Sequence, residues 1–194
     1  FGFEKVYEDR RALIDDPDVD IVYIVLPHVF HREIAEMALL AGKAVLCEKP
    51  LTPSYEETRA LVGLARREGV FLMEAMKTGF LPAIQKAKEW IEEGRIGDLT
   101  VLQADFCFQG PDDPKDRLMN PDLGGGCTLD VGIYPLYLSR LFAGDTSAIQ
   151  AAGSFTETGV EDTVSIALRH EGGTCSALSA SFRAAEAMDA RILG

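Results

Sequence analysis

The segment Asp20-Ile-Val-Tyr-Ile-Val-Leu-Pro27 is the clearest indication of how the first third of the chain folds. Its apolar residues continue without a break until Leu26-Pro27, and such a run is typical of a strand that is buried on both faces. Residues 30–40 then repeat apolar side chains at helical spacing and end at Gly42, in the usual C-cap position. Residues 43–47 return to the pattern of a short strand.

A second helix and a third strand extend this alternation. Ser54 can cap a helix, and Glu57 three residues later completes a capping box for a helix that stops at Gly69. Residues 70–75 form the third predicted strand. Strands and helices that alternate with short connections are typical of a parallel sheet with right-handed crossovers. Residues 1–77 are therefore predicted to be half of a Rossmann-type, doubly wound α/β sheet.

After residue 77 the pattern changes. Helices are predicted at 81–93 and 127–142, and a polar loop rich in Pro, Asp and Gly covers 109–126. Strand-like runs lie at 99–108, 149–156, 163–169 and 175–182, and another begins at Asp189. Short links that contain Gly join the later runs, as in antiparallel hairpins. Residues 78–194 are predicted to form a second, α+β domain with an open, mainly antiparallel sheet.

The composition argues against several classes of function. The chain of 194 residues has a net charge of −12 and no basic stripe, so nucleic-acid binding has no support. No apolar run approaches the ~20 residues of a membrane span, and no membrane partner is expected. The four cysteines lack a metal-ligand spacing, which predicts no metal site, free thiols and a reducing, cytoplasmic location. The abrupt ends at Phe1 and Gly194 are those expected of a fragment.

Glu48-Lys49-Pro50 follows the second predicted strand and is the first candidate for chemistry. Ligands of open α/β sheets bind beyond the carboxyl ends of the strands, so a lysine at that edge can face a cofactor. Pro50 biases Lys49 toward an extended backbone and thereby aims its side chain. The alternative, on position alone, is a surface lysine at a strand end.

The second candidate is the run from Gly124-Gly-Gly126 to Tyr134-Pro135. Three glycines allow another group to approach the backbone closely. Asp130 and Tyr134 are four residues apart and should share a helical face. Pro135 lacks a backbone donor and should loosen the helix around Val131. The alternative is that the glycines form a tight turn and that Tyr134 is a half-buried core residue.

The third candidate is His31, five residues after Leu26-Pro27, at the start of a predicted helix. A positive charge is disfavoured there by the helix dipole, so a neutral ring could donate to a ribose or a phosphate. The alternative is an ordinary capping or surface histidine.

Together these motifs resemble the Gfo/Idh/MocA oxidoreductases over essentially the whole chain. The glycine run with Tyr134, where many relatives carry His, and Met73-Glu-Ala-Met76 are most similar to the branch that holds glucose–fructose oxidoreductase and the dimeric dihydrodiol dehydrogenases. The resemblance implies that residues 1–77 are the C-terminal half of a dinucleotide-binding domain. It also implies that residues 78–194 are an incomplete substrate-binding and oligomerisation domain.

The resemblance implies roles for individual residues as well. Lys49 would lie near the nicotinamide and the substrate hydroxyl, Tyr134 would be the acid/base, and Asp130 would hold the substrate. The cofactor, NADP or NAD, would be bound by Leu26, Pro27, His31, Glu48, Lys49 and Pro50.

Elementary chemistry agrees with these roles. Oxidation of an alcohol removes a hydride from carbon and a proton from oxygen. A free tyrosine has a pKa near ~10, too high for an efficient base at neutral pH, and a nearby ammonium group favours the phenolate. The predicted reaction is hydride transfer between the cofactor and the secondary alcohol or carbonyl of a sugar, polyol or trans-dihydrodiol, with Tyr134 as acid/base and Lys49 as its charge partner.

Two departures from the family pattern bear on the cofactor and the substrate. The glycine-rich GxGxxG fingerprint is absent from these residues, as is the residue that distinguishes NAD from NADP. In Lys77-Thr-Gly-Phe-Leu-Pro82, a glycine stands where an arginine is usual in this branch. The second departure leaves the substrate open more than the reaction.

Two other functions stay open at this point. One is a non-catalytic, dinucleotide-binding or sugar-sensing regulator, and the other is an oligomeric scaffold that binds nothing small. Lys49, Asp130 and Tyr134 favour the enzyme, because a sensor has no need of an acid/base pair. A homodimer or higher homo-oligomer is expected through the exposed face of the second sheet, where small residues would let another sheet approach: Ser165, Ala167, Ser179 and Ser181.

Overall fold

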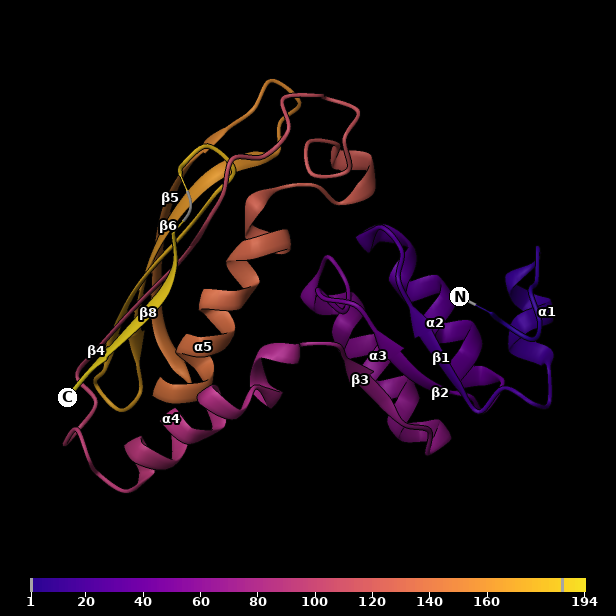
Figure 1. The fold of residues 1–194 in the computed structure, drawn as a ribbon, viewed down its shortest axis with the longest axis horizontal. Helices are drawn as coiled ribbons and strands as arrows, with labels where there is room; N and C mark the ends of the chain where they lie inside the picture. Colours follow the sequence, from indigo (N-terminus) through magenta and orange to yellow (C-terminus); the bar gives the residue numbers. More distant parts are fainter. Residues whose placement is uncertain (1, 186) are drawn as a thin grey trace. The chain divides into compact units, whose positions relative to one another are not determined.

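The computed structural model describes residues 2–185 and 187–194. The chain divides into two compact units, Phe1–Ala75 and Met76–Gly194 (Figure 1).

The first unit is a parallel sheet with helices between its strands. Its strands lie in the order β1 (Ile21–Ile24), β2 (Ala44–Cys47) and β3 (Leu72–Glu74), and both pairings are parallel. Its helices are α1 (Arg10–Asp15), the 3-10 turn η1 (His28–Phe30), α2 (His31–Leu40) and α3 (Tyr55–Glu68). The predicted alternation of strand and helix is confirmed. The predicted N-cap is confirmed as well, because Ser54 Oγ accepts a hydrogen bond of 3.3 Å from the main-chain N–H of Glu57.

One expectation for β1 is wrong in this chain. Val22 and Ile24 are buried in the core that α2 and α3 form with the strands, whereas Ile21 and Tyr23 are 51% and 54% exposed. The strand is therefore buried on one face and not on both. The reason is that α2 and α3 follow consecutive crossovers of the same hand, which bring both helices to the same face of the sheet.

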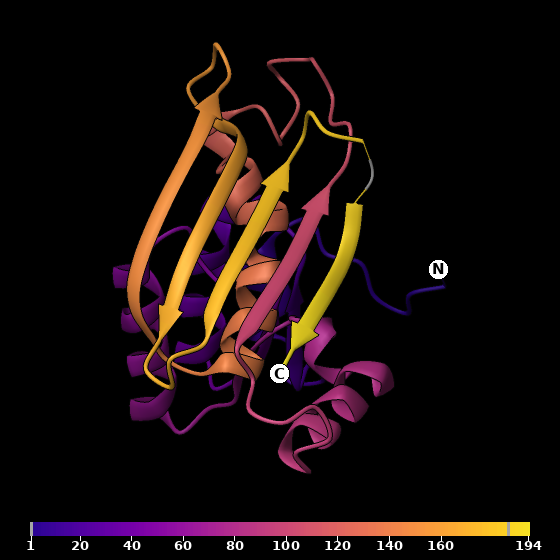
Figure 2. The ribbon, with the colours of Figure 1, turned by 90° about the vertical axis from the view of Figure 1, so that its left-hand side faces the viewer.

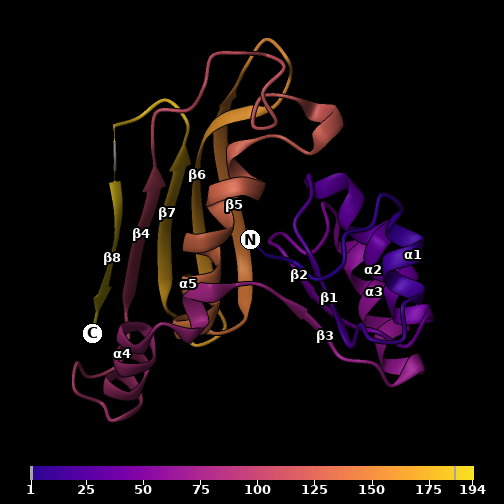
Figure 3. The same cartoon turned by 45° about the vertical axis from the view of Figure 1, so that its right-hand side comes forward.

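The second unit is built on a five-stranded, open, mixed sheet (Figure 3). The strand order is β5 (Thr146–Phe155), β6 (Glu161–His170), β7 (Cys175–Ser181), β4 (Val101–Cys107) and β8 (Ala187–Leu193). β4 and β7 are parallel, and the other neighbours are antiparallel, as predicted for a mainly antiparallel sheet. Its helices are η2 (Lys77–Phe80), α4 (Pro82–Glu92), η3 (Pro121–Leu123), the π-helical segment η4 (Thr128–Gly132) and α5 (Ile133–Ala143).

Helix α5 covers one face of this sheet (Figure 2). A buried polar cluster joins the helix to the strands: His170 Nε2 lies 3.0 Å from Ser139 Oγ and 2.9 Å from Ser176 Oγ. Nδ1 of the same ring lies 3.0 Å from the carbonyl oxygen of Gly144. Because that carbonyl can only accept, Nδ1 donates a hydrogen bond to it. This cluster fixes the C-terminal half of α5 on β6 and β7.

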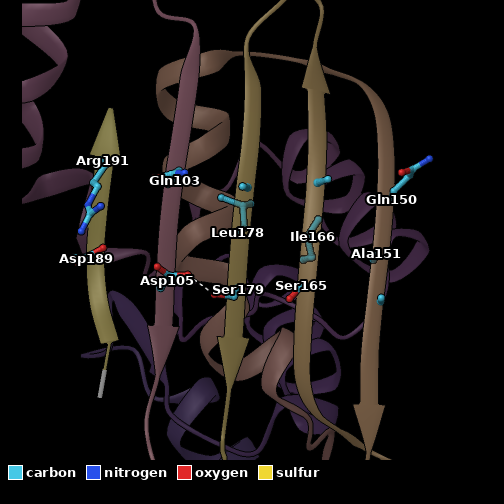
Figure 4. A pocket seen from close by; sticks show the side chains of 13 residues that line it. Gln103, Asp105, Gln150, Ala151, Ser165, Ile166, Leu178, Ser179, Asp189 and Arg191 are labelled. Carbon is cyan, nitrogen blue, oxygen red and sulfur yellow. Dashed lines mark hydrogen bonds between the residues drawn. The ribbon is translucent and has the colours of Figure 1, made fainter. Parts of the chain in front are cut away.

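The opposite face of the second sheet is open. It holds a shallow hollow of about 690 Å³, lined by small and polar side chains from all five strands (Figure 4). Ser165, Ala167 and Ser179, three of the four small residues expected on the exposed face, line it. Ser181 does not, because it is buried and its Oγ is 2.8 Å from Thr163 Oγ1. Within the part of the chain that the structure describes, no helix is long and apolar enough to cross a bilayer.

The glycine run ends the loop before η4, and the structure accounts for two of its members. A Cβ atom on Gly125 would lie 2.6 Å from the carbonyl oxygen of Leu118. A Cβ atom on Gly126 would lie 2.7 Å from the carboxylate of Glu161, which accepts the N–H of Thr128 at 3.1 Å. The groups that approach these glycines closely therefore belong to the chain itself, and the alternative of a tight turn is correct.

We expect Gly125→Ala to lower the stability of the full-length protein by about 1–3 kcal/mol, the usual cost of forced overpacking. The clash is with main chain, which cannot rotate away as a side chain can. Gly172→Ala is the matched control, because a Cβ atom there meets nothing within 4 Å and its φ is not positive. Chemical unfolding curves compare the two variants, and equal midpoints for Gly125→Ala and Gly172→Ala would contradict this account of the turn.

Candidate functional site

The predicted site residues lie in two sets. Leu26, Pro27, His31, Glu48, Lys49 and Pro50 belong to the first unit, at the carboxyl ends of β1 and β2 or just beyond them. Asp130 and Tyr134 belong to the second unit, at the junction of η4 and α5. In the first set, hydrogen bonds hold the main chain on either side of Lys49. In the second set, an ion pair holds the side chain of Asp130.

The turn after β2 is held by hydrogen bonds at successive residues. The N–H of Glu48 donates to Ile24 O at 2.9 Å and so extends the ladder with β1 by one residue. The N–H of Lys49 donates to its neighbour's carboxylate, Glu48 Oε2, at 3.3 Å. The N–H of Leu51 donates to Glu74 Oε1 at 2.7 Å, across from β3. Lys49 therefore sits inside a short turn whose main-chain donors are satisfied on either side of it.

His31 lies under the same turn and is fully buried. Its Nδ1 is 2.8 Å from Pro50 O and its Nε2 is 2.8 Å from Leu26 O, so one ring links the segments that follow β1 and β2. The alternative of a surface histidine is wrong. Both ring nitrogens face main-chain carbonyls in this structure. Direct donation to a ribose or a phosphate stays a prediction.

Carboxylates lie close to this edge of the sheet. The hydroxyl of Tyr23 donates to Glu48, and this hydrogen bond to a carboxylate raises the pKa of Tyr23. Burial, followed by the charges of Glu74 and Glu48, raises the pKa of Cys47 to about 12. Cys47 is therefore a neutral thiol at physiological pH and is not suited to be a nucleophile.

The second set surrounds a buried carboxylate. Asp130 lies on η4 and is buried, and its Oδ1 is 3.0 Å from Nη1 of Arg117, whose side chain is half exposed. Tyr134 lies in the first turn of α5, half buried, with its ring centroid 5.1 Å from that of Phe106. The expected loosening near Val131 is confirmed, because Thr128–Gly132 is π-helical. Single π-helical turns within helices occur often at functional sites.

Gly79 stands where an arginine is usual in this branch of the family, and the structure shows what occupies the space beside it. A Cβ atom on Gly79 would collide with the hydroxyl of Tyr137, which lies one turn after Tyr134 on α5. The phenol of Tyr137 therefore occupies the space that a side chain at position 79 would need. The contact between position 79 and Tyr137 could not be predicted from the sequence, because the two residues are far apart in the chain.

The carboxyl edge of the first unit carries groups that could hold part of a dinucleotide. Leu26 is 43% exposed there, so its apolar side chain could pack against a ring of the cofactor, and Lys49 follows the neighbouring strand. Sequence reasoning missed Glu74, Tyr23 and Arg117. Only Glu74 had a signal, as a member of Met73-Glu-Ala-Met76. Within residues 2–185 and 187–194, no cluster of His, Cys, Asp or Glu is arranged to hold a metal ion.

Known proteins resemble this chain in both units. It is 42% identical to trans-1,2-dihydrobenzene-1,2-diol dehydrogenase of Mus musculus over 91% of this chain and 54% of that protein. The structure of an aldose–aldose oxidoreductase from Caulobacter crescentus, complexed with glycerol, is similar with a TM-score of 0.89 and 31% identity, over 97% of this chain and 58% of that one. The structure of a levoglucosan dehydrogenase in complex with NADH and levoglucosan is similar with a TM-score of 0.90 and 30% sequence identity. The match covers 100% of this chain and 56% of that one.

The chain thus spans about half the length of the curated relatives that it matches. Its first 76 residues match the model of an oxidoreductase family with an NAD-binding Rossmann fold. Residues 84–194 match the model of the GFO/IDH/MocA C-terminal domain. The two family domains follow one another in order along nearly the whole chain, and the chain belongs to the GFO/IDH/MocA family of oxidoreductases.

Proposed function

We propose that the full-length protein transfers a hydride between a nicotinamide cofactor, NADP or NAD, and the secondary alcohol or carbonyl of a sugar, polyol or trans-dihydrodiol. The observation that carries the proposal is the turn that contains Lys49. Hydrogen bonds with Glu74 and His31 hold this turn at the carboxyl edge, where α/β sheets bind cofactors. The names of the relatives support the substrate class, and a neighbour that holds NADH supports the cofactor.

Each candidate residue has a task in this reaction. As the alcohol is oxidised, the C–H bond gives up its hydrogen and electron pair, and the hydroxyl proton passes to the phenolate of Tyr134 while the carbonyl forms. The ammonium group of Lys49 would favour that phenolate and the negative charge on the substrate oxygen. The cofactor supplies the hydride acceptor. In the reverse direction, Tyr134 returns the proton.

Asp130 is proposed to orient the substrate. Its carboxylate is buried and already engaged by Arg117 at 3.0 Å, so its direction is set before a substrate arrives. A fixed carboxylate can accept a hydrogen bond from a sugar or diol hydroxyl without loss of side-chain entropy on binding.

A non-catalytic, sugar-sensing regulator would use the same fold and bind the same small molecules. A panel of sugars, polyols and trans-dihydrodiols, supplied with oxidised cofactor, separates the two functions. We expect reduced cofactor to form with at least one diol or polyol, whereas a regulator would bind and leave the cofactor oxidised.

A homodimer and a cytoplasmic location complete the proposal. The hollow on the open face of the second sheet carries Asp105, Asp189 and Arg191 at its β4–β8 side, next to small residues on β5, β6 and β7 (Figure 4). Two copies related by a twofold axis could set the arginine of each against carboxylates of the other while the small residues meet. The four free cysteines support a reducing compartment.

We expect Tyr134→Phe to leave the cofactor dissociation constant nearly unchanged and to lower turnover by about 10² or more, the typical effect of a positioned acid/base. Phenylalanine keeps the ring that packs on Phe106 and removes only the ionisable hydroxyl. Cofactor fluorescence titration and steady-state kinetics measure the two quantities. Wild-type turnover at neutral pH would show that another group carries the proton.

Lys49→Met should reduce turnover more than Lys49→Arg, because the arginine retains a charge although its geometry differs. Without the cation the phenolate is disfavoured, so the pKa of Tyr134 should rise. The limb of the pH–rate profile that reports its ionisation should therefore move to higher pH in Lys49→Met. If that limb does not move, Lys49 and Tyr134 are not electrostatically coupled.

Light scattering at micromolar concentration should give the full-length protein the mass of a dimer. Ala177→Arg puts a large cation in the hollow and should shift the mass toward the monomer. Ala60→Arg is the matched control, because it makes the same change at an exposed position of α3. A monomeric mass for the wild type, or equal behaviour of the two variants, would remove the proposed interface.

A further inference from the structure

Glu74 belongs to the segment Met73-Glu-Ala-Met76, which the proposed reaction leaves without a task. It is the last residue of β3 and stands opposite Cys47, the last residue of β2. Its Oε1 accepts the N–H of Leu51 at 2.7 Å, and this bond crosses from β3 to the turn that contains Lys49.

The N–H of Leu51 needs a side-chain partner. The ladder between β2 and β3 ends where the N–H of Ala75 donates to Cys47 O, and among the described residues no strand carbonyl accepts from Leu51. Leu51 is only 8% exposed, and a buried N–H without an acceptor is costly. A carboxylate also makes a stronger and shorter hydrogen bond than a neutral acceptor.

This bond fixes the far end of the turn. The near end is held by Glu48 in the ladder with β1, and Pro50 O lies 2.8 Å from His31. Lys49 lies between these fixed points. Without the bond from Glu74, Leu51 would be free to move away from β3, and the turn could rotate the lysine side chain with it.

We propose that Glu74 is a positioning residue for Lys49: by accepting the N–H of Leu51, it sets the direction in which the lysine side chain leaves the sheet edge. The inference rests on the proposed function of Lys49. It concerns the hydrogen bond and not the charge of Glu74, so an amide acceptor at the same place should serve.

The test uses the full-length protein with Glu74→Ala, Glu74→Gln, Lys49→Met and the double variant Glu74→Ala/Lys49→Met. The readout is the single-turnover rate of cofactor reduction with a diol or polyol that the wild type oxidises. We expect Glu74→Ala to lower this rate by about 10–100-fold, the scale of a small misplacement of a reacting group. Glu74→Gln should stay within about threefold of the wild type, because its side-chain carbonyl can accept from Leu51.

The double variant separates positioning from general damage. If Glu74 acts through Lys49, Glu74→Ala should add less than about threefold to the loss in Lys49→Met, because residues that act as a unit are not additive. An equal loss in both backgrounds would make Glu74 a structural residue, and a Gln variant as slow as the Ala variant would assign the effect to charge. Either result overturns the proposal.

Amide hydrogen exchange at Leu51 gives a readout that does not depend on catalysis. Exchange should be faster in Glu74→Ala and unchanged in Glu74→Gln, and unchanged exchange in both variants would overturn the proposal. If instead Lys49→Met has wild-type turnover while exchange responds as expected, the bond exists and the function proposed for Lys49 is what has failed.

Discussion

The parallel ladder of the first unit ends at the carboxyl edge, and how the chain leaves that ladder governs everything proposed for Lys49. Main-chain donors of the turn beyond Glu48 must find partners outside the strand ladder. Here side chains from β3 and α2 take over, through Glu74 on the N–H of Leu51 and His31 beside the carbonyl of Pro50. The lysine is thereby held by the requirement that its neighbours' polar groups be satisfied.

In the second unit, contacts from other segments hold helix α5 at both ends. Three features set the start of α5: the close-packed glycine turn, the Glu161 carboxylate that accepts the N–H of Thr128, and the π-helical segment before the helix. The cluster of His170, Ser139 and Ser176 fixes its other half on the sheet. A phenol in the first turn of such a helix has little freedom, which is what a positioned acid/base requires.

Local patterns in the sequence were enough to predict much of this. The alternation around residues 20–75 predicted the parallel sheet, Ser54 and Glu57 predicted a helix start, and Pro135 predicted the loosened turn near Val131. Each strand, helix start and loosened turn was predicted from residues within a few positions of one another, and the parallel sheet followed from the order of the predicted elements. The resemblance to a family then pointed to Lys49, Asp130 and Tyr134 as the residues to inspect.

The rest depended on contacts between distant residues. Glu74 meets Leu51 across 23 positions, and the partners Arg117 and Asp130 are 13 apart. The exposed side of β1 likewise reflects which helices cover the sheet, and a run of apolar residues reads the same whether one face or both are covered. Such pairings follow from the folded arrangement, and the spacing of neighbouring residues in the sequence does not predict them.

Direct hydride transfer from a carbon that bears a hydroxyl group is the reaction proposed for this protein. Mass spectrometry of the nicotinamide cofactor can detect it after the full-length protein has been incubated with a diol or polyol deuterated at that carbon. We expect one deuterium on the reduced nicotinamide ring. A protein that binds both molecules and leaves the cofactor unlabelled would not be the proposed oxidoreductase.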